Sequence, residues 1–138
     1  MLVLTRSVVE QLLDLEELEG ALARAHEELS SGAVSMPPRI AAWAKEQGLL
    51  GAMPAYLPSA GLGCKLVTLF SGNTDRPTHQ AAIMLFDPAN GSPVALMDGT
   101  YITEARTAGA AALASVMYVP SMSATGDPLA GSKSMIAA

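Results

Sequence analysis

The sequence predicts an α/β fold of the α+β type, in which one long helix is followed by a group of neighbouring strands. From Leu15 to Leu29, apolar residues recur every three or four positions and charged residues fill the positions between them. Residues 61–106 are typical of three strands, with a tight Asn90-Gly91 hairpin between the second and third and a helix directly after them. Hydrophobic residues make up 50% of the 138 residues and charged residues 15%, which argues against disorder and fits one domain.

The composition excludes several kinds of site. The single cysteine, Cys64, cannot form an internal disulfide, and with two histidines it supplies too few soft ligands for a structural zinc site. A net charge of -5 disfavours nucleic acid and acidic membranes as partners. We find no membrane span or leader pattern and expect a cytoplasmic protein. The apolar content, which includes eight methionines, predicts a surface covered by a second subunit or a further domain.

The first third of the chain carries signals for helix starts. Residues 2–4 are a short apolar run that we interpret as a strand or an extended arm. Ser7 stands three residues before Glu10, and Asp14 stands three residues before Glu17, which is the capping-box spacing. We therefore expect a short helix and then the long one.

Extended chain follows the helix stop at Gly32. The paired prolines 37–38 forbid helix, so Arg39 leaves a stiff segment that can present its guanidinium at a fixed position. An ordinary surface arginine is the alternative. Residues 41–47 are compatible with a strand or a loop, and residues 49–57 form an extended apolar run.

Lys65 and Arg106 are two further cations in apolar surroundings. Lys65 interrupts a run, CKLVTLF, that otherwise predicts a buried strand, so it must find an anion, lose its proton or open onto a cavity. Arg106 lies on the predicted helix among alanines and glycines, where a snorkelling arginine is the alternative. With Arg39, the three cations would suit a carboxylate, and Thr78 could add a hydrogen bond at the rim. These residues alone leave an anion-binding module and half of an enzyme equally open.

The order of these segments resembles the N-terminal region of the ornithine cyclodeaminase/mu-crystallin family over roughly residues 1–114. The matching segments are SMPPRI, LLGAMPAYLP, GLGCKLVTLF and PTHQAAIMLFDPANGSPVALMDGTYITEARTA. The resemblance implies a mixed β-sheet substrate-binding domain flanked by helices, a homodimer formed by joined sheets, and a Rossmann domain further along the chain. We place the domain at residues 1–116 and expect residues 117–138, which lack periodicity and do not match, to be a poorly ordered tail.

The resemblance also implies an activity. Members exchange hydride between NAD(P) and the α-carbon of an amino or imino acid, as cyclodeaminases, alanine dehydrogenases or ketimine reductases, and one member binds thyroid hormone. It implies that Arg39, Lys65 and Arg106 hold the substrate carboxylate, that Lys65 lies closest to the reacting centre as the catalytic residue, and that Thr78 lines the pocket. Ornithine-specific members carry an acidic residue where this chain has Gly51.

The chain departs from the family pattern in having no glycine-rich turn between a strand and a helix. The GLG at residues 61–63 precedes a strand, so it is not a dinucleotide fingerprint. We therefore expect a truncated oxidoreductase that binds no NAD(P) by itself and is inactive alone. The alternatives are a non-catalytic module for a small carboxylate or hormone-like ligand, and an unstable fragment.

Overall fold

The computed structural model describes residues 1–111, which form one six-stranded mixed sheet with helices packed against it. The strand order is β1-β6-β5-β4-β3-β2. The strands are β1 (Leu2–Leu4), β2 (Ile40–Trp43), β3 (Leu49–Leu57), β4 (Gly61–Leu69), β5 (His79–Phe86) and β6 (Pro93–Asp98). Pairing is antiparallel throughout except for β1, which runs parallel to β6. This arrangement confirms the predicted fold class.

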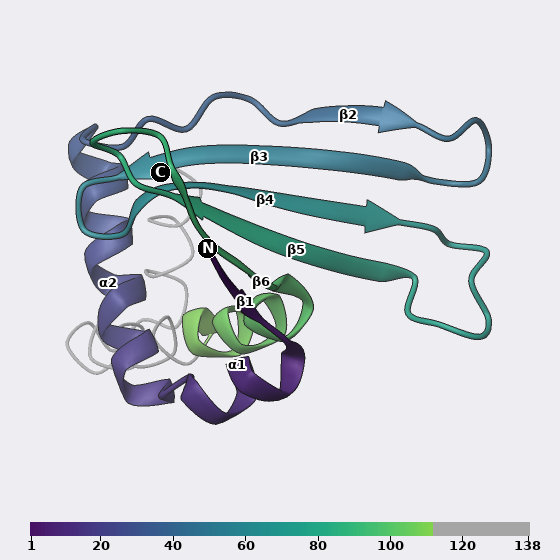
Figure 1. The fold of residues 1–138 in the computed structure, drawn as a ribbon, viewed down its shortest axis with the longest axis horizontal. Helices are drawn as coiled ribbons and strands as arrows, with labels where there is room; N and C mark the ends of the chain where they lie inside the picture. The colour runs from purple at the N-terminus through teal and green to yellow at the C-terminus, as the bar shows by residue number, and fades with distance from the viewer. Residues whose placement is uncertain (112–138) are drawn as a thin grey trace, which may run out of the picture.

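Two helices precede most of the sheet and one follows it. They are α1 (Arg6–Leu12), α2 (Leu15–Ser31) and an unlabelled helix of residues 99–111, which is the green helix of Figure 1. Figure 1 shows all three gathered at one end of the strands, while the other end extends beyond them. None of the helices in residues 1–111 combines the length and the apolar character needed to cross a membrane.

The helix ends show which capping signals were right. The Asp14 side chain accepts hydrogen bonds from the backbone N–H groups of Glu16 and Glu17, at 2.8 and 3.0 Å, as an N-cap does. Gly32 ends α2 in the left-handed conformation, with φ of 77°. The Ser7 signal was wrong, because α1 already begins at Arg6 and Thr5 is its N-cap.

One face of the sheet is covered by the helices, and the other is open. Side chains alternate along a strand, so Gly51, Val67 and Ala95 share the face that also carries Lys65. All three of these residues are buried. We call this the covered face.

The open face is the opposite face, and its apolar side chains remain exposed. It carries Val3, Ile40, Leu50, Tyr56 and Leu66. Exposure reaches 68% for Ile40, although the residue lies within a strand. Among residues 1–111, only three apolar side chains are buried: those of Val9, Val67 and Ala95. The domain therefore has a thin core and a large uncovered apolar surface, as the composition predicted.

The strand register explains the position of two residues. Pro54 lies in β3 beyond the point where pairing with β2 ends at Ala52, so the ladder needs no N–H from it on that side. The undecided residues 41–47 divide between β2 and a turn, in which Lys45 has a positive φ of 51°. The predicted domain boundary at residue 116 and the predicted tail lie outside the described residues.

Candidate functional site

Lys65 lies at the middle of β4, on the covered face. It is directly opposite Met53 of β3 on one side and Ile83 of β5 on the other. The residue is half-buried, and its ammonium has no hydrogen bond or ion pair within residues 1–111. A charge among apolar neighbours without a partner is unfavourable unless something compensates it.

The structure brings Arg39 and Arg106 towards Lys65. Burial lowers the pKa of the Lys65 ammonium, and the positive charges of Arg106 and Arg39 lower that pKa further. Arg39 immediately precedes Ile40, which pairs with Ala52, so Arg39 lies next to Met53 and one strand away from Lys65. Both arginines are exposed. The three cations therefore share one region above the covered face.

Three local features fix the helix that carries Arg106. The Asp98 side chain accepts a hydrogen bond from the Tyr101 N–H at 2.9 Å, which caps the helix start. The Thr100 hydroxyl accepts a hydrogen bond from the Ala81 N–H of β5 at 3.0 Å. A Cβ on Gly99 would lie 3.1 Å from backbone atoms of Ala81 and Ala82, so glycine lets the helix start approach β5 without a tight contact.

The start of this helix could be predicted from the sequence, whereas the contacts that hold the helix could not. Asp98 could have been recognised as an N-cap from its place just before Gly99. The bond between Thr100 and β5 joins residues 19 positions apart and leaves no local signal. The role of Thr100 in positioning this helix is therefore visible only in the structure.

None of the three cations is neutralised by an acidic side chain in the described part of the chain. The ion pairs there join Arg6 to Glu10 and Glu104, and Arg76 to Asp75. Clustered cations that lack anions are suited to an anionic ligand, and guanidinium groups match the two oxygens of a carboxylate or the oxygens of a phosphate. The arrangement can therefore bind a small anion beside a half-buried amine.

Thr78 does not lie beside the three cations. It is exposed and immediately precedes β5, where its carbonyl accepts a hydrogen bond from the Phe70 N–H at 2.8 Å. Ile83, the partner of Lys65, is five positions further along, which corresponds to about 16 Å of strand. The predicted role of Thr78 in lining the pocket stays a prediction.

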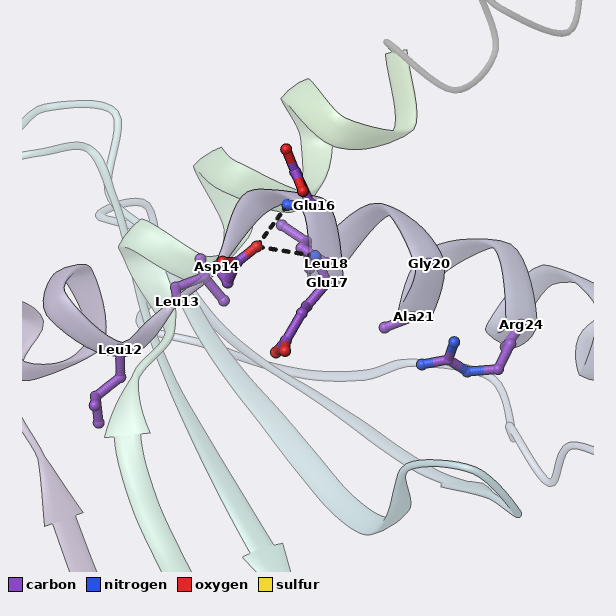
Figure 2. Close-up of a pocket in the computed structure, with 9 residues that line it drawn as sticks. All are labelled: Leu12, Leu13, Asp14, Glu16, Glu17, Leu18, Gly20, Ala21 and Arg24. Atoms are coloured by element: carbon purple, nitrogen blue, oxygen red, sulfur yellow. Dashed lines mark hydrogen bonds between the residues drawn. The ribbon is translucent and has the colours of Figure 1, made fainter.

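Two surface hollows among the described residues lie elsewhere, and neither is lined by the three cations. One of about 700 Å³ lies where α1 meets α2 and is lined by Leu12, Asp14 and Arg24 among others. Figure 2 shows that its walls come from one continuous segment, with Asp14 engaged in capping α2. The second, of about 390 Å³, lies between α2 and the helix of residues 99–111. The cations lie instead above the covered face of the sheet, around Lys65.

Sequence comparison assigns the chain to a family. The sequence model of the ornithine cyclodeaminase/mu-crystallin family matches residues 1–130. The chain belongs to this family. The match confirms the resemblance and reaches beyond residue 116, where we placed the domain boundary.

Known members of the ornithine cyclodeaminase/mu-crystallin family share both sequence and fold with this chain. Mouse ketimine reductase mu-crystallin is 43% identical over 106 residues, which cover 75% of this chain and 34% of the mouse protein. The Thermococcus litoralis Δ1-pyrroline-2-carboxylate reductase, solved with NADH and L-proline, is 38% identical with a TM-score of 0.75. That match covers 80% of this chain and 36% of the reductase.

A second solved structure is an archaeal alanine dehydrogenase dimer with bound NAD. It is 38% identical with a TM-score of 0.74, and the match covers 80% of this chain and 34% of the dehydrogenase. The chain thus spans about a third of the length of these relatives.

The described residues do not fit the NAD that family members bind. The GLG at residues 61–63 opens β4 inside the β3–β4 hairpin, where Gly61 has a φ of 89°. A dinucleotide fingerprint would instead follow a strand and open a helix. Residues 1–111 contain no such turn.

Proposed function

We propose that this chain supplies the carboxylate-binding site of an NAD(P)-dependent oxidoreductase or cyclodeaminase that acts on a small amino or imino acid. The observation that carries the proposal is the half-buried Lys65, which has two guanidinium groups nearby and no acidic partner in residues 1–111. Membership of the family supports the substrate class.

Each cation has a distinct role in this proposal. Arg39 and Arg106 present planar guanidinium groups, so they hold the carboxylate and set its orientation. Lys65 lies deeper and has a lowered pKa, so it can both contact the carboxylate and exchange a proton at the substrate nitrogen. Thr78 would line a more distant part of the pocket.

Calorimetric titration with L-alanine, L-proline and pyruvate tests this site. Arg106→Gln should weaken binding about tenfold to a hundredfold, because a hydrogen bond to a charged group contributes about 1.5–3 kcal/mol. The matched control is Arg24→Gln, which removes an arginine on α2 that lies away from the three cations. Equal affinity of the two variants for all three ligands would refute the carboxylate site.

A non-catalytic module for a small carboxylate or a hormone-like ligand is the second candidate. It is favoured by the lack of a dinucleotide-binding turn in residues 1–111. Addition of NADH to the whole 138-residue chain, together with any partner chain, separates the two candidates. A rise in melting temperature or a change in NADH fluorescence would favour the oxidoreductase. Binding of the carboxylate without either effect would favour the module.

We further propose that the open face joins a second copy of the chain in a homodimer. The support is its row of exposed apolar side chains, including Ile40, Leu50 and Leu66, which a monomer would leave in water. The archaeal alanine dehydrogenase was solved as a dimer.

We also propose a cytoplasmic location. The support is the single cysteine of the sequence, which cannot form an internal disulfide.

A further inference from the structure

Lys65 differs in reactivity from an ordinary surface lysine. An amine attacks carbonyl carbon only in its neutral form, and both burial and the nearby arginines favour that form at Lys65. Lys65 is also the one amine of the group, and it lies half-buried at the middle of β4 while both arginines are exposed. Within residues 1–111 no carboxylate is paired with the ammonium to stabilise its charge.

The neighbouring groups also select the kind of carbonyl compound. Arg39 lies next to Met53, the β3 residue opposite Lys65, and Arg106 is near enough for its charge to act on the Lys65 amine. The two guanidinium groups can therefore hold an anionic group beside that amine. A 2-oxo acid carries its carbonyl carbon directly next to a carboxylate, so binding of the carboxylate would bring that carbon close to Nζ. Proximity of this type raises the rate of reaction.

We propose that Lys65 is a site of covalent imine formation with 2-oxo acids, directed by Arg39 and Arg106. The neutral Nζ attacks the carbonyl carbon and forms a C–N bond, and the carbonyl oxygen takes up a proton to give a carbinolamine. That oxygen then leaves as water together with the remaining hydrogen of the nitrogen, and a C=N bond results. No oxidant or reductant is consumed. The inference rests on the carboxylate site proposed above and adds a covalent step to it.

The chain contains its own comparison group. Lys45 lies in the exposed turn between β2 and β3, where it forms no ion pair with an acidic side chain of residues 1–111. Lys45 is therefore the exposed lysine against which Lys65 is compared in the same molecule and under the same conditions. The Met1 amine can be read separately in the same peptide map.

Reductive trapping tests the inference. The whole chain is incubated with limiting glyoxylate and cyanoborohydride, and the modified lysines are quantified by peptide mass spectrometry. We expect Lys65 to be labelled at least about tenfold more than Lys45. Acetaldehyde lacks the carboxylate, so it should reduce this preference to a few-fold, and urea-unfolded chain should show none. Equal labelling of the two lysines by glyoxylate in the folded chain would overturn the inference.

Two measurements keep this failure separate from failure of the proposed function. Lactate has a carboxylate but no ketone or aldehyde carbonyl that an amine could attack, so its calorimetric binding reports the carboxylate site alone. Lactate binding without preferential Lys65 labelling would remove the imine step and leave the proposed function intact. Absence of binding by lactate and pyruvate, together with equal labelling, would remove both. Arg106→Lys keeps the charge but loses the planar fork, so it should lower the Lys65 preference without unfolding the chain.

Discussion

The hydroxyl of Thr100 accepts a hydrogen bond from the backbone N–H of Ala81, at a distance of 3.0 Å. This bond attaches the start of the helix of residues 99–111 to β5, which lies next to the strand of Lys65. Arg106 follows less than two turns later on the same helix. The position of Arg106 relative to Lys65 thus depends on the hydrogen bond between Thr100 and Ala81, in which neither cation takes part.

Thr100→Val should destabilise the chain by about 1–2 kcal/mol, because it leaves the part-buried Ala81 N–H without an acceptor. Carboxylate binding should weaken as well, since the helix is no longer held to β5. Urea unfolding and calorimetry measure the two effects. Thr107→Val is the control, because the Thr107 hydroxyl is exposed and bonds only within its own helix. Equal stability of the two variants would contradict the anchoring role.

Gly99→Ala should cost about 1–3 kcal/mol, because the new Cβ would lie 3.1 Å from backbone atoms of Ala81 and Ala82. The helix would have to move away from β5. Gly72→Ala is the matched control, since a Cβ there meets nothing within 4 Å. Thermal unfolding compares them, and a Gly99→Ala melting temperature no lower than that of Gly72→Ala would show that the close approach is not required.

Asp98→Ala and Asp14→Ala each remove an N-cap and should each cost about 1 kcal/mol in the free energy of unfolding. Their effects on ligand binding should differ. Asp98 caps the helix that carries Arg106, whereas Asp14 caps α2, which carries none of the three cations. Pyruvate affinity should therefore fall in Asp98→Ala only. A similar fall in both variants would indicate a general loss of structure.

Lys65→Met should stabilise the chain at neutral pH by about 0.5–1 kcal/mol, because it replaces a half-buried charge with an apolar side chain beside Met53 and Ile83. The pKa of Lys65 is lowered in the fold from 10.5, so the protonated form opposes folding. Wild-type stability should rise as pH increases from the lowered pKa towards 10.5, and the advantage of Lys65→Met should shrink over that window. Urea titrations at neutral pH and about pH 10 measure this difference.

Leu66→Glu should reduce self-association, because it places a charge in the middle of the open face. Sedimentation over a concentration series measures the dimer fraction, which should fall at least about tenfold. Leu12→Glu is the control, since Leu12 is also an exposed leucine but lies on α1, away from the open face. If both variants associate as the wild type does, the open face is not the interface.

Most of the secondary structure could be predicted from the sequence because its signals are local. The period of α2, its Asp14 cap and its Gly32 stop all lie within one segment, and the strand-hairpin-strand-helix order of residues 61–106 is confirmed. The cap of α1 was wrong by two residues because Thr5 and Ser7 are chemically alike, and their hydroxyls even contact each other at 3.1 Å. Such alternatives differ by too little energy for a pattern to decide.

The site was harder to predict because it depends on register. Arg39 was notable from the paired prolines before it, and Lys65 and Arg106 from their apolar surroundings. Only the pairing of β2, β3 and β4 places Arg39 across β3 from Lys65. The same register places Thr78 towards the far end of β5. A slip of β4 by one residue against its neighbours would move Lys65 to the open face, and no local motif encodes that choice.

Because the helices gather at one end of the strands, the sheet is supported at that end and overhangs at the other (Figure 1). At the supported end, the Glu28 carboxylate of α2 accepts hydrogen bonds from the backbone N–H and the hydroxyl of Ser59, which lies in the turn between β3 and β4. The overhanging end carries Trp43 and Leu69, exposed at 73% and 47%. The two ends of the sheet therefore differ in support: one is hydrogen-bonded to a helix, and the other leaves large side chains in water.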